Sequence, residues 1–183
     1  MNALTDNAIM LRVKGGDLDK MGLLFERYHR QLYGFLFHMT YHREGSEDLV
    51  QQVFYKMLKY RNTFTGSGEF IHWMYSIARN TIKDRVKSKK HQVRHEDVED
   101  YGDRLAGGIT PDEHLEKKQA KQELYKAMER LSDDHREVLA LSRFQELKYQ
   151  EIAEILNISE VAVKTRAHRA MQELKNIYIK IER

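Results

Sequence analysis

The most informative stretch of the sequence lies near its C-terminal end, from Leu147 to Lys175, and reads LKYQEIAEILNISEVAVKTRAHRAMQELK. Apolar residues recur at helical spacing as far as Leu156, stop at Asn157, and resume after Ser159. Asparagine tolerates the left-handed backbone that ends many helices, and a serine hydroxyl can accept a hydrogen bond from the first turn of the next helix. The stretch therefore predicts two helices joined by a tight turn.

The second of these predicted helices has an apolar side and a polar side. The apolar stripe consists of Val163, Ala167, Ala170, Met171 and Leu174. The opposite side carries Glu160, Lys164, Thr165, His168, Arg169 and Gln172. A face of this kind fits the DNA major groove, so we interpret the stretch as a helix-turn-helix with its recognition helix second. Amphipathic helices with a basic outer face also occur in bundles that never touch DNA, and the rest of the chain must separate these interpretations.

The composition indicates an all-α protein. The 183 residues suffice for one ordinary domain or two small ones, and 41% hydrophobic with 32% charged residues is a globular balance. A single proline and few alternating β-branched runs favour helices. The absence of cysteine excludes disulfides and cysteine-liganded zinc, and it fits a reducing cytoplasm. No apolar run approaches the ~20 residues of a membrane span, and no secretory signal opens the chain, so we expect a cytoplasmic protein without membrane insertion.

The net charge of +3 conceals a strong alternation along the chain. Residues 76–95 hold seven basic residues against one acid, and residues 96–116 hold eight acids against one arginine. Residues 164–183 are basic again, with six basic and two acidic residues. Two basic blocks that flank an acidic one predict two separate surfaces for a polyanion, joined by a segment that repels it.

The N-terminal half reads as four helices. We expect a helix over residues 6–14, a long one from Leu18, a third capped by Ser46 after a break at residues 44–46, and a fourth from about Phe70 to Lys90. Residues 61–69 read as a polar loop with one exposed aromatic, Phe64. We therefore predict a first domain at residues 1–90, a flexible acidic linker at 91–109, and a second domain at 110–183 that starts with a proline-initiated helix.

The fourth predicted helix combines aromatic and basic residues beside the polar loop. Unpaired bases stack on aromatic rings while cations hold the phosphate backbone, so this combination suits a single-stranded nucleic acid. The alternative is that Trp73 and Tyr75 are simply core residues, and for Trp73 we prefer that alternative. The basic face of the helix includes Arg79, Asn80, Lys83, Lys87, Lys89 and Lys90.

No catalytic site, metal site or cofactor is predicted. The chain lacks a phosphate-binding glycine loop, a metalloprotease HExxH motif and a nucleophile elbow. Two histidine pairs with a spacing of four residues, His38 with His42 and His91 with His95, could share a metal on a helix face. We regard a metal-dependent enzyme as the weakest hypothesis, because no carboxylate or cysteine lies in register with either pair.

The order of the motifs closely resembles the extracytoplasmic-function sigma factors, group IV of the sigma-70 family of bacterial initiation factors. The first half carries KGGD at 14–17, EDLVQQVF at 47–54 and WMYSIARN at 73–80, which are similar to the second conserved region of that family. The second half carries TPDE at 110–113, LSDDHREV at 131–138, YQEIA at 149–153 and VKTRAHRA at 163–170, which are similar to the fourth. The resemblance implies two helical domains joined by a linker, and a subunit without catalytic activity.

The resemblance also implies the partners and the residues that contact them. The partners would be the clamp helices of the largest subunit of core RNA polymerase, the flap of the second-largest subunit, and promoter DNA in duplex and single-stranded form. The residues expected to bind polymerase are Asp48, Gln51, Gln52 and Lys56. Those expected at the downstream promoter element are Thr63, Phe64, Ser67, Arg79, Asn80, Lys83 and Lys87. Those expected at the upstream element are Ser159, Glu160, Lys164, Thr165, Arg166, His168 and Arg169.

Three positions depart from the family pattern and bear on the strength of polymerase binding. Gln52 stands where an acid is frequent, Ser132 replaces a frequent proline, and Lys148 replaces a frequent serine or threonine helix cap. The family also includes members that are held inactive by an anti-sigma protein, so such a regulator or another recruiting protein is a further expected partner. The rival hypothesis is a stand-alone helix-turn-helix regulator whose first domain dimerises or senses a ligand.

Overall fold

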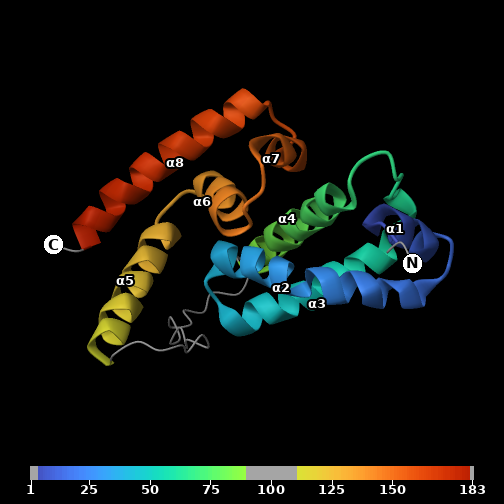
Figure 1. Ribbon diagram of the computed structural model, residues 1–183, viewed down its shortest axis with the longest axis horizontal. Helices are drawn as coiled ribbons and strands as arrows, with labels where there is room; N and C mark the ends of the chain where they lie inside the picture. Colours follow the sequence, from blue (N-terminus) through green and yellow to red (C-terminus); the bar gives the residue numbers. More distant parts are fainter. Residues whose placement is uncertain (1–3, 90–110, 182–183) are drawn as a thin grey trace.

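The computed structural model describes residues 4–89 and 111–181, which form helices joined by short turns, as predicted (Figure 1). The expected linker and the histidines at 91 and 95 lie outside the described residues. The N-terminal half consists of α1 (Asp6–Lys14), η1 (Leu18–Lys20), α2 (Met21–Thr40), α3 (Arg43–Lys59), η2 (Arg61–Thr63) and α4 (Phe70–Lys89). The C-terminal half consists of α5 (Pro111–Glu129), α6 (Asp133–Leu139), η3 (Ala140–Phe144), α7 (Tyr149–Leu156) and α8 (Glu160–Ile181).

The N-terminal half is a bundle in which α3 packs against both α2 and α4. The residues that face inward keep the helical spacing expected from the sequence, and Leu24, Phe35, Leu49 and Met74 are fully buried. Within the described residues, no helix combines the length and the apolar character that a membrane span requires.

The start of α3 differs from the prediction. Ser46 was expected to cap this helix, but α3 already begins at Arg43, and the Nδ1 atom of His42 accepts the hydrogen bond from the Gly45 amide at 2.9 Å. The Ser46 hydroxyl is buried and donates to the His42 carbonyl at 2.6 Å. A Cβ at position 45 would lie 2.4 Å from a guanidinium nitrogen of Arg85. The glycine that suggested a helix break instead leaves room for the Arg85 side chain beside the first turn, and the buried serine hydroxyl bonds back to the residue before the helix.

The C-terminal half contains the predicted helix-turn-helix. Asn157 adopts the left-handed backbone (φ 54°, ψ 48°) that ends α7. The Ser159 hydroxyl accepts a hydrogen bond from the Ala162 amide at 3.1 Å and so caps α8. Lys148 provides no acceptor at the start of α7, but the Glu151 carboxylate accepts a hydrogen bond from the Lys148 amide at 2.8 Å. Both turn residues named from the sequence are confirmed in their structural roles.

The two halves pack against each other and share one continuous core. Helix α2 contacts α6 and η3, and α4 contacts α7. The ring of His38 stacks on Phe144 with the ring centroids 3.6 Å apart, and an Nη1–H of Arg136 donates to the Met39 carbonyl at 3.1 Å. Burial, with a smaller contribution from Lys121, lowers the pKa of His38 to about 4. The interface therefore holds a neutral imidazole at neutral pH.

Candidate protein and nucleic-acid interfaces

One exposed polar face lies on α3. Asp48, Gln51 and Gln52 are spaced so that they share one side of the helix, and all three are exposed as predicted. Tyr55, which was not among the predicted residues, continues this face and is 65% exposed. A tyrosine at that exposure offers an apolar ring with a polar end, which is typical of protein interfaces.

Lys56 has a different environment from its neighbours on α3. Its ammonium lies 2.7 Å from the Asp84 carboxylate on α4, and its side chain is mostly buried whereas that of Asp84 is exposed. The hydrogen bond from Lys56 lowers the pKa of Asp84. Lys56 therefore joins α3 to α4, and its charge is already partnered within the chain.

The loop before α4 corrects one prediction. Phe64 was expected to be an exposed aromatic, but its side chain is only 3% exposed and its ring packs 5.3 Å from that of Trp73. Trp73 is partly buried against the core, in agreement with the preferred interpretation. Because the loop turns inward between α1 and α4, the Phe64 ring is not available to stack on a base. Thr63 and Ser67 remain exposed.

The shape of this loop is held by α1. The Asn7 side chain donates to the Gly68 carbonyl at 2.9 Å and accepts from the Phe70 amide at 2.7 Å. The Lys14 ammonium donates to the Phe64 carbonyl at 2.7 Å. These contacts join residues far apart in the sequence, so no local sequence pattern could predict them.

Arg79 is separated from the other candidate residues of α4. Asn80, Lys83 and Lys87 are exposed, as predicted. The Arg79 guanidinium instead binds both carboxylate oxygens of Glu137 on α6, at 2.6 and 3.2 Å, and donates to the Ile155 carbonyl at 2.9 Å. This arrangement fixes α4 to the C-terminal half and leaves little of the Arg79 charge facing outward.

The candidate face of α8 is open to solvent. Ser159, Glu160, Lys164, Thr165, His168 and Arg169 are all exposed. Arg166 departs from this set, because its side chain is mostly buried and its guanidinium lies 3.7 Å from the Asp134 carboxylate on α6. The structure therefore keeps six of the seven predicted residues exposed and turns Arg166 towards the body of the domain.

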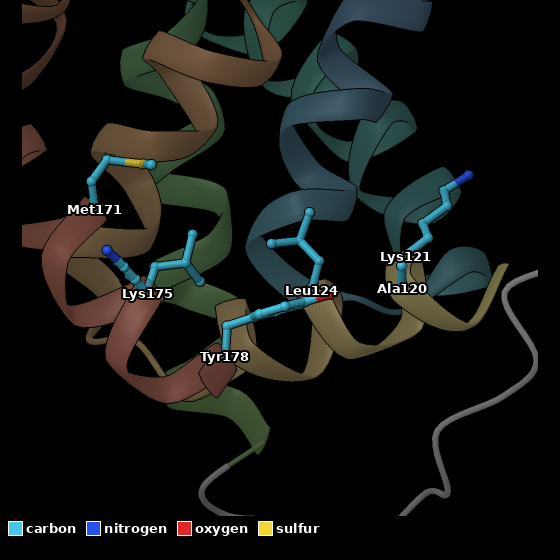
Figure 2. Close-up of a pocket in the computed structure, with 7 residues that line it drawn as sticks. Ala120, Lys121, Leu124, Met171, Lys175 and Tyr178 are labelled. Atoms are coloured by element: carbon cyan, nitrogen blue, oxygen red, sulfur yellow. The ribbon is translucent and has the colours of Figure 1, made fainter. Parts of the chain in front are cut away.

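A shallow, mostly apolar groove lies between α5 and α8 (Figure 2). Leu124 from α5 and Tyr178 from α8 contribute to its lining, and Lys121 and Lys175 add basic side chains. The sequence did not indicate this groove because the α5 and α8 stripes meet only in the folded chain. The full lining consists of Ala120, Lys121, Leu124, Met171, Leu174, Lys175 and Tyr178.

The histidine pair that the structure describes is used in packing and capping. His38 stacks on Phe144, and His42 accepts the hydrogen bond from Gly45 at the start of α3. Over residues 4–89 and 111–181, no group of three or more histidine, cysteine or acidic side chains is arranged to hold a metal ion. The geometry offers surfaces for macromolecules.

Comparison with known proteins agrees with both halves of the chain. Residues 24–92 match the family described as Sigma-70 region 2, and residues 121–174 match Sigma-70, region 4. The RNA polymerase sigma factor YlaC of Bacillus subtilis is 33% identical over 160 residues, which cover 86% of this chain and 91% of that relative. The chain belongs to the extracytoplasmic-function (ECF) sigma factors.

Other ECF sigma factors match at similar coverage. SigX of Bacillus subtilis is 33% identical over 84% of this chain and 80% of its own length. The sigma-E factor of Escherichia coli is 28% identical over 94% of each chain. Because region 2 and region 4 both match, in this order, the stand-alone regulator with an unrelated first domain is not favoured.

Solved structures show the same fold. CnrH, solved with the cytosolic domain of CnrY, aligns with a TM-score of 0.69 at 19% identity, over 94% of this chain and 96% of that one. The sigma factor RpoE of Bartonella quintana, solved with the anti-sigma factor NepR, aligns with a TM-score of 0.68 at 21% identity, over 88% and 98%. The two-part helical architecture is thus that of ECF sigma factors, a family of transcription initiation factors.

Proposed function

We propose that this ECF sigma factor binds core RNA polymerase in the cytoplasm, directs it to specific promoters and helps to open them, without catalytic activity of its own. The observation that carries the proposal is that one chain presents two separate exposed faces, one on α3 and one on α8, of different chemistry. The α3 face is acidic to neutral and includes an exposed tyrosine, whereas the α8 face is basic. The first suits a protein and the second suits a polyanion.

For polymerase, the α3 face is the proposed docking surface for the clamp helices of the largest subunit. Asp48 would supply charge, Gln51 and Gln52 hydrogen bonds, and Tyr55 apolar contact. The groove between α5 and α8 is the proposed seat of the flap of the second-largest subunit. Its apolar floor suits the apolar face of a helix, and Lys121 and Lys175 would favour acidic residues beside that face.

For DNA, the two promoter elements would be read by different halves. The exposed face of α8 would enter the major groove of the upstream element, where polar side chains meet base edges and phosphates. Thr63 and Ser67 of the loop, with Asn80, Lys83 and Lys87 of α4, would hold the unpaired strand of the downstream element. The predicted linker at 91–109 would separate two domains with these distinct tasks.

A regulatory protein is a further proposed partner. The similar structures of CnrH and of RpoE were each solved with a second protein, which is an anti-sigma factor in the case of RpoE. A protein of that class that covers the α3 face or the α5–α8 groove would exclude polymerase from this chain.

The proposal is tested by mixing the purified chain with core RNA polymerase from its source bacterium. We expect co-elution from a sizing column, and transcripts from genomic DNA whose start sites share two spaced sequence motifs. The double variant Asp48→Lys with Gln51→Ala should no longer co-elute with polymerase. It reverses the charge at position 48 and removes the side-chain amide at position 51 of the α3 face. Asp19→Lys, which makes the same charge change at an exposed acid on η1, is the matched control.

Two results would contradict different parts of the proposal. Retention of polymerase binding by the α3 double variant would remove α3 as the docking surface. Failure of the unmodified chain to bind polymerase at low salt, with tight binding to duplex DNA by the chain alone, would overturn the proposed function.

A further inference from the structure

Val161 is a conspicuous residue on the α8 face. It is the second residue of α8 and is 72% exposed, the highest value among the large hydrophobic residues of the described chain. Its position is three, four and seven residues before Lys164, Thr165 and His168, so all four side chains share one side of the helix. An exposed aliphatic group therefore lies within the face proposed to enter the major groove.

Folding gives no reason for a valine at this position. β-Branched residues are poorer helix formers than alanine, because their side-chain rotamers are restricted in a helix. At 72% exposure the side chain also removes little apolar surface from water. An alanine here would favour the helix more, so the two methyl groups of Val161 are better explained by an external contact.

The polar neighbours of Val161 are already engaged within the helix. The Thr165 hydroxyl donates to the Val161 carbonyl at 2.9 Å. The Lys164 ammonium lies 3.4 Å from the Glu160 carboxylate. These contacts lie on either side of Val161, whose methyl groups form the exposed apolar part of the first turn of α8.

The base edges of the major groove offer one apolar group. Among the four base pairs, only those with thymine present a methyl group there, and the other groups are hydrogen-bond donors or acceptors. A β-branched side chain holds its methyl groups in few positions and so makes a defined apolar contact. We propose that Val161 is a specificity-determining residue that packs against the methyl group of a thymine in the upstream promoter element. This inference rests on the proposed function of α8.

The test removes the methyl group of thymine without changing any hydrogen-bonding group of the base. The full-length chain is assembled with core polymerase on a promoter duplex found by transcript mapping, and each thymine of the upstream element is replaced in turn by deoxyuridine. We expect one replacement to weaken binding by about fourfold, the value for a single buried methyl group. In Val161→Ala the same replacement should have no effect, because the partner of the methyl group is gone.

Ile179→Ala provides the matched control, since Ile179 is an exposed aliphatic residue (39%) near the other end of α8. This variant should retain the response of the unmodified chain. The inference is overturned if every deoxyuridine replacement is neutral, or if Val161→Ala keeps the full response.

A scrambled upstream element distinguishes this failure from failure of the proposed function. If scrambling weakens binding while deoxyuridine does not, α8 reads the element and only the role of Val161 is wrong. If scrambling has no effect, the proposed role of α8 is wrong and the inference falls with it.

Discussion

Helices α4 and α8 both carry basic side chains proposed to contact DNA, but their surroundings differ. On α8, Lys164, His168 and Arg169 are exposed. On α4, Arg79 is held by Glu137 and by the Ile155 carbonyl, both from the C-terminal half. Each helix thus turns one predicted arginine towards α6, but Arg79 is held by two close contacts to Glu137, whereas Arg166 lies 3.7 Å from the exposed Asp134.

This difference has an energetic counterpart. The Arg79 and Glu137 side chains are 19% and 9% exposed, and they form a bidentate pair. The pair between Lys164 and Glu160 on α8 is largely exposed. Removal of one partner from a buried pair leaves an uncompensated charge, whereas an exposed pair contributes little. We call the contact between the two halves, which includes Arg79 and Glu137, the covered side, and the exposed face of α8 the open side. Mutations on the covered side should therefore change stability, and mutations on the open side should change binding.

The strongest way to break this comparison is Glu137→Ala. We expect the free energy of unfolding in urea to fall by about 3 kcal/mol, because Arg79 is left without its carboxylate. The two halves should also separate more readily, which small-angle X-ray scattering would detect as a larger radius of gyration. A loss below about 1 kcal/mol with unchanged dimensions would show that this pair does not hold the halves together.

A second, smaller effect concerns His38, on the covered side. Its pKa is lowered from 6.5 to about 4 in the folded chain, so the unfolded chain binds more protons between these values. The contribution of His38 to the free energy of unfolding is therefore complete above pH 6.5 and is lost as the pH falls towards 4. Compared with His38→Phe, the unmodified chain should lose about 2.5 kcal/mol of unfolding free energy between pH 6.5 and pH 4, measured by urea unfolding at several pH values.

His168→Phe, at an exposed histidine on α8, is the matched control and should keep the pH dependence of the unmodified chain. If His38→Phe and the unmodified chain show the same pH dependence, then the stacked ring is not held neutral by the interface.

The smallest effect on stability is expected on the open side, at Lys164. Lys164→Ala should change the free energy of unfolding by less than about 0.5 kcal/mol, because the side chain is exposed and its ion pair is weak. Binding of the polymerase complex to promoter duplexes should weaken, and the slope of log affinity against log salt should become shallower by about 1. An unchanged slope would place Lys164 away from the phosphates.

Local signals in the sequence were sufficient for most of the fold. Asn157 and Ser159 revealed the turn of the helix-turn-helix because a left-handed helix end and a cap depend on neighbouring residues only. The bounds of α1 and the start of α4 followed from local signals in the same way. The start of α3 was misjudged because Gly45 is required by Arg85, a residue from another helix.

The candidate surfaces were less predictable, for the same reason. Helical spacing shows that a side chain points away from its own bundle, but it does not show what else packs there. Arg79 lies on the basic face of its helix by spacing, and Arg166 was expected at the upstream element from the resemblance alone. In the folded chain, Glu137 and Asp134 of α6 meet these two side chains. Phe64 was placed in a loop and therefore assumed to be exposed, although α1 and α4 enclose it.

In the π-helical segment η3, the number of residues matters as much as their identity. The backbone N–H of Gln145 donates a hydrogen bond at 3.0 Å to the carbonyl of Ala140, five residues earlier. This turn is therefore one residue wider than an α-helical turn. Each residue advances an α-helix by about 100°. A π-helical turn takes in one more residue than an α-helical turn, so loss of a single codon here would remove the widened turn that precedes Gln145 and carries Phe144 to His38. Substitution of the exposed Arg143 would keep the number of residues in that turn.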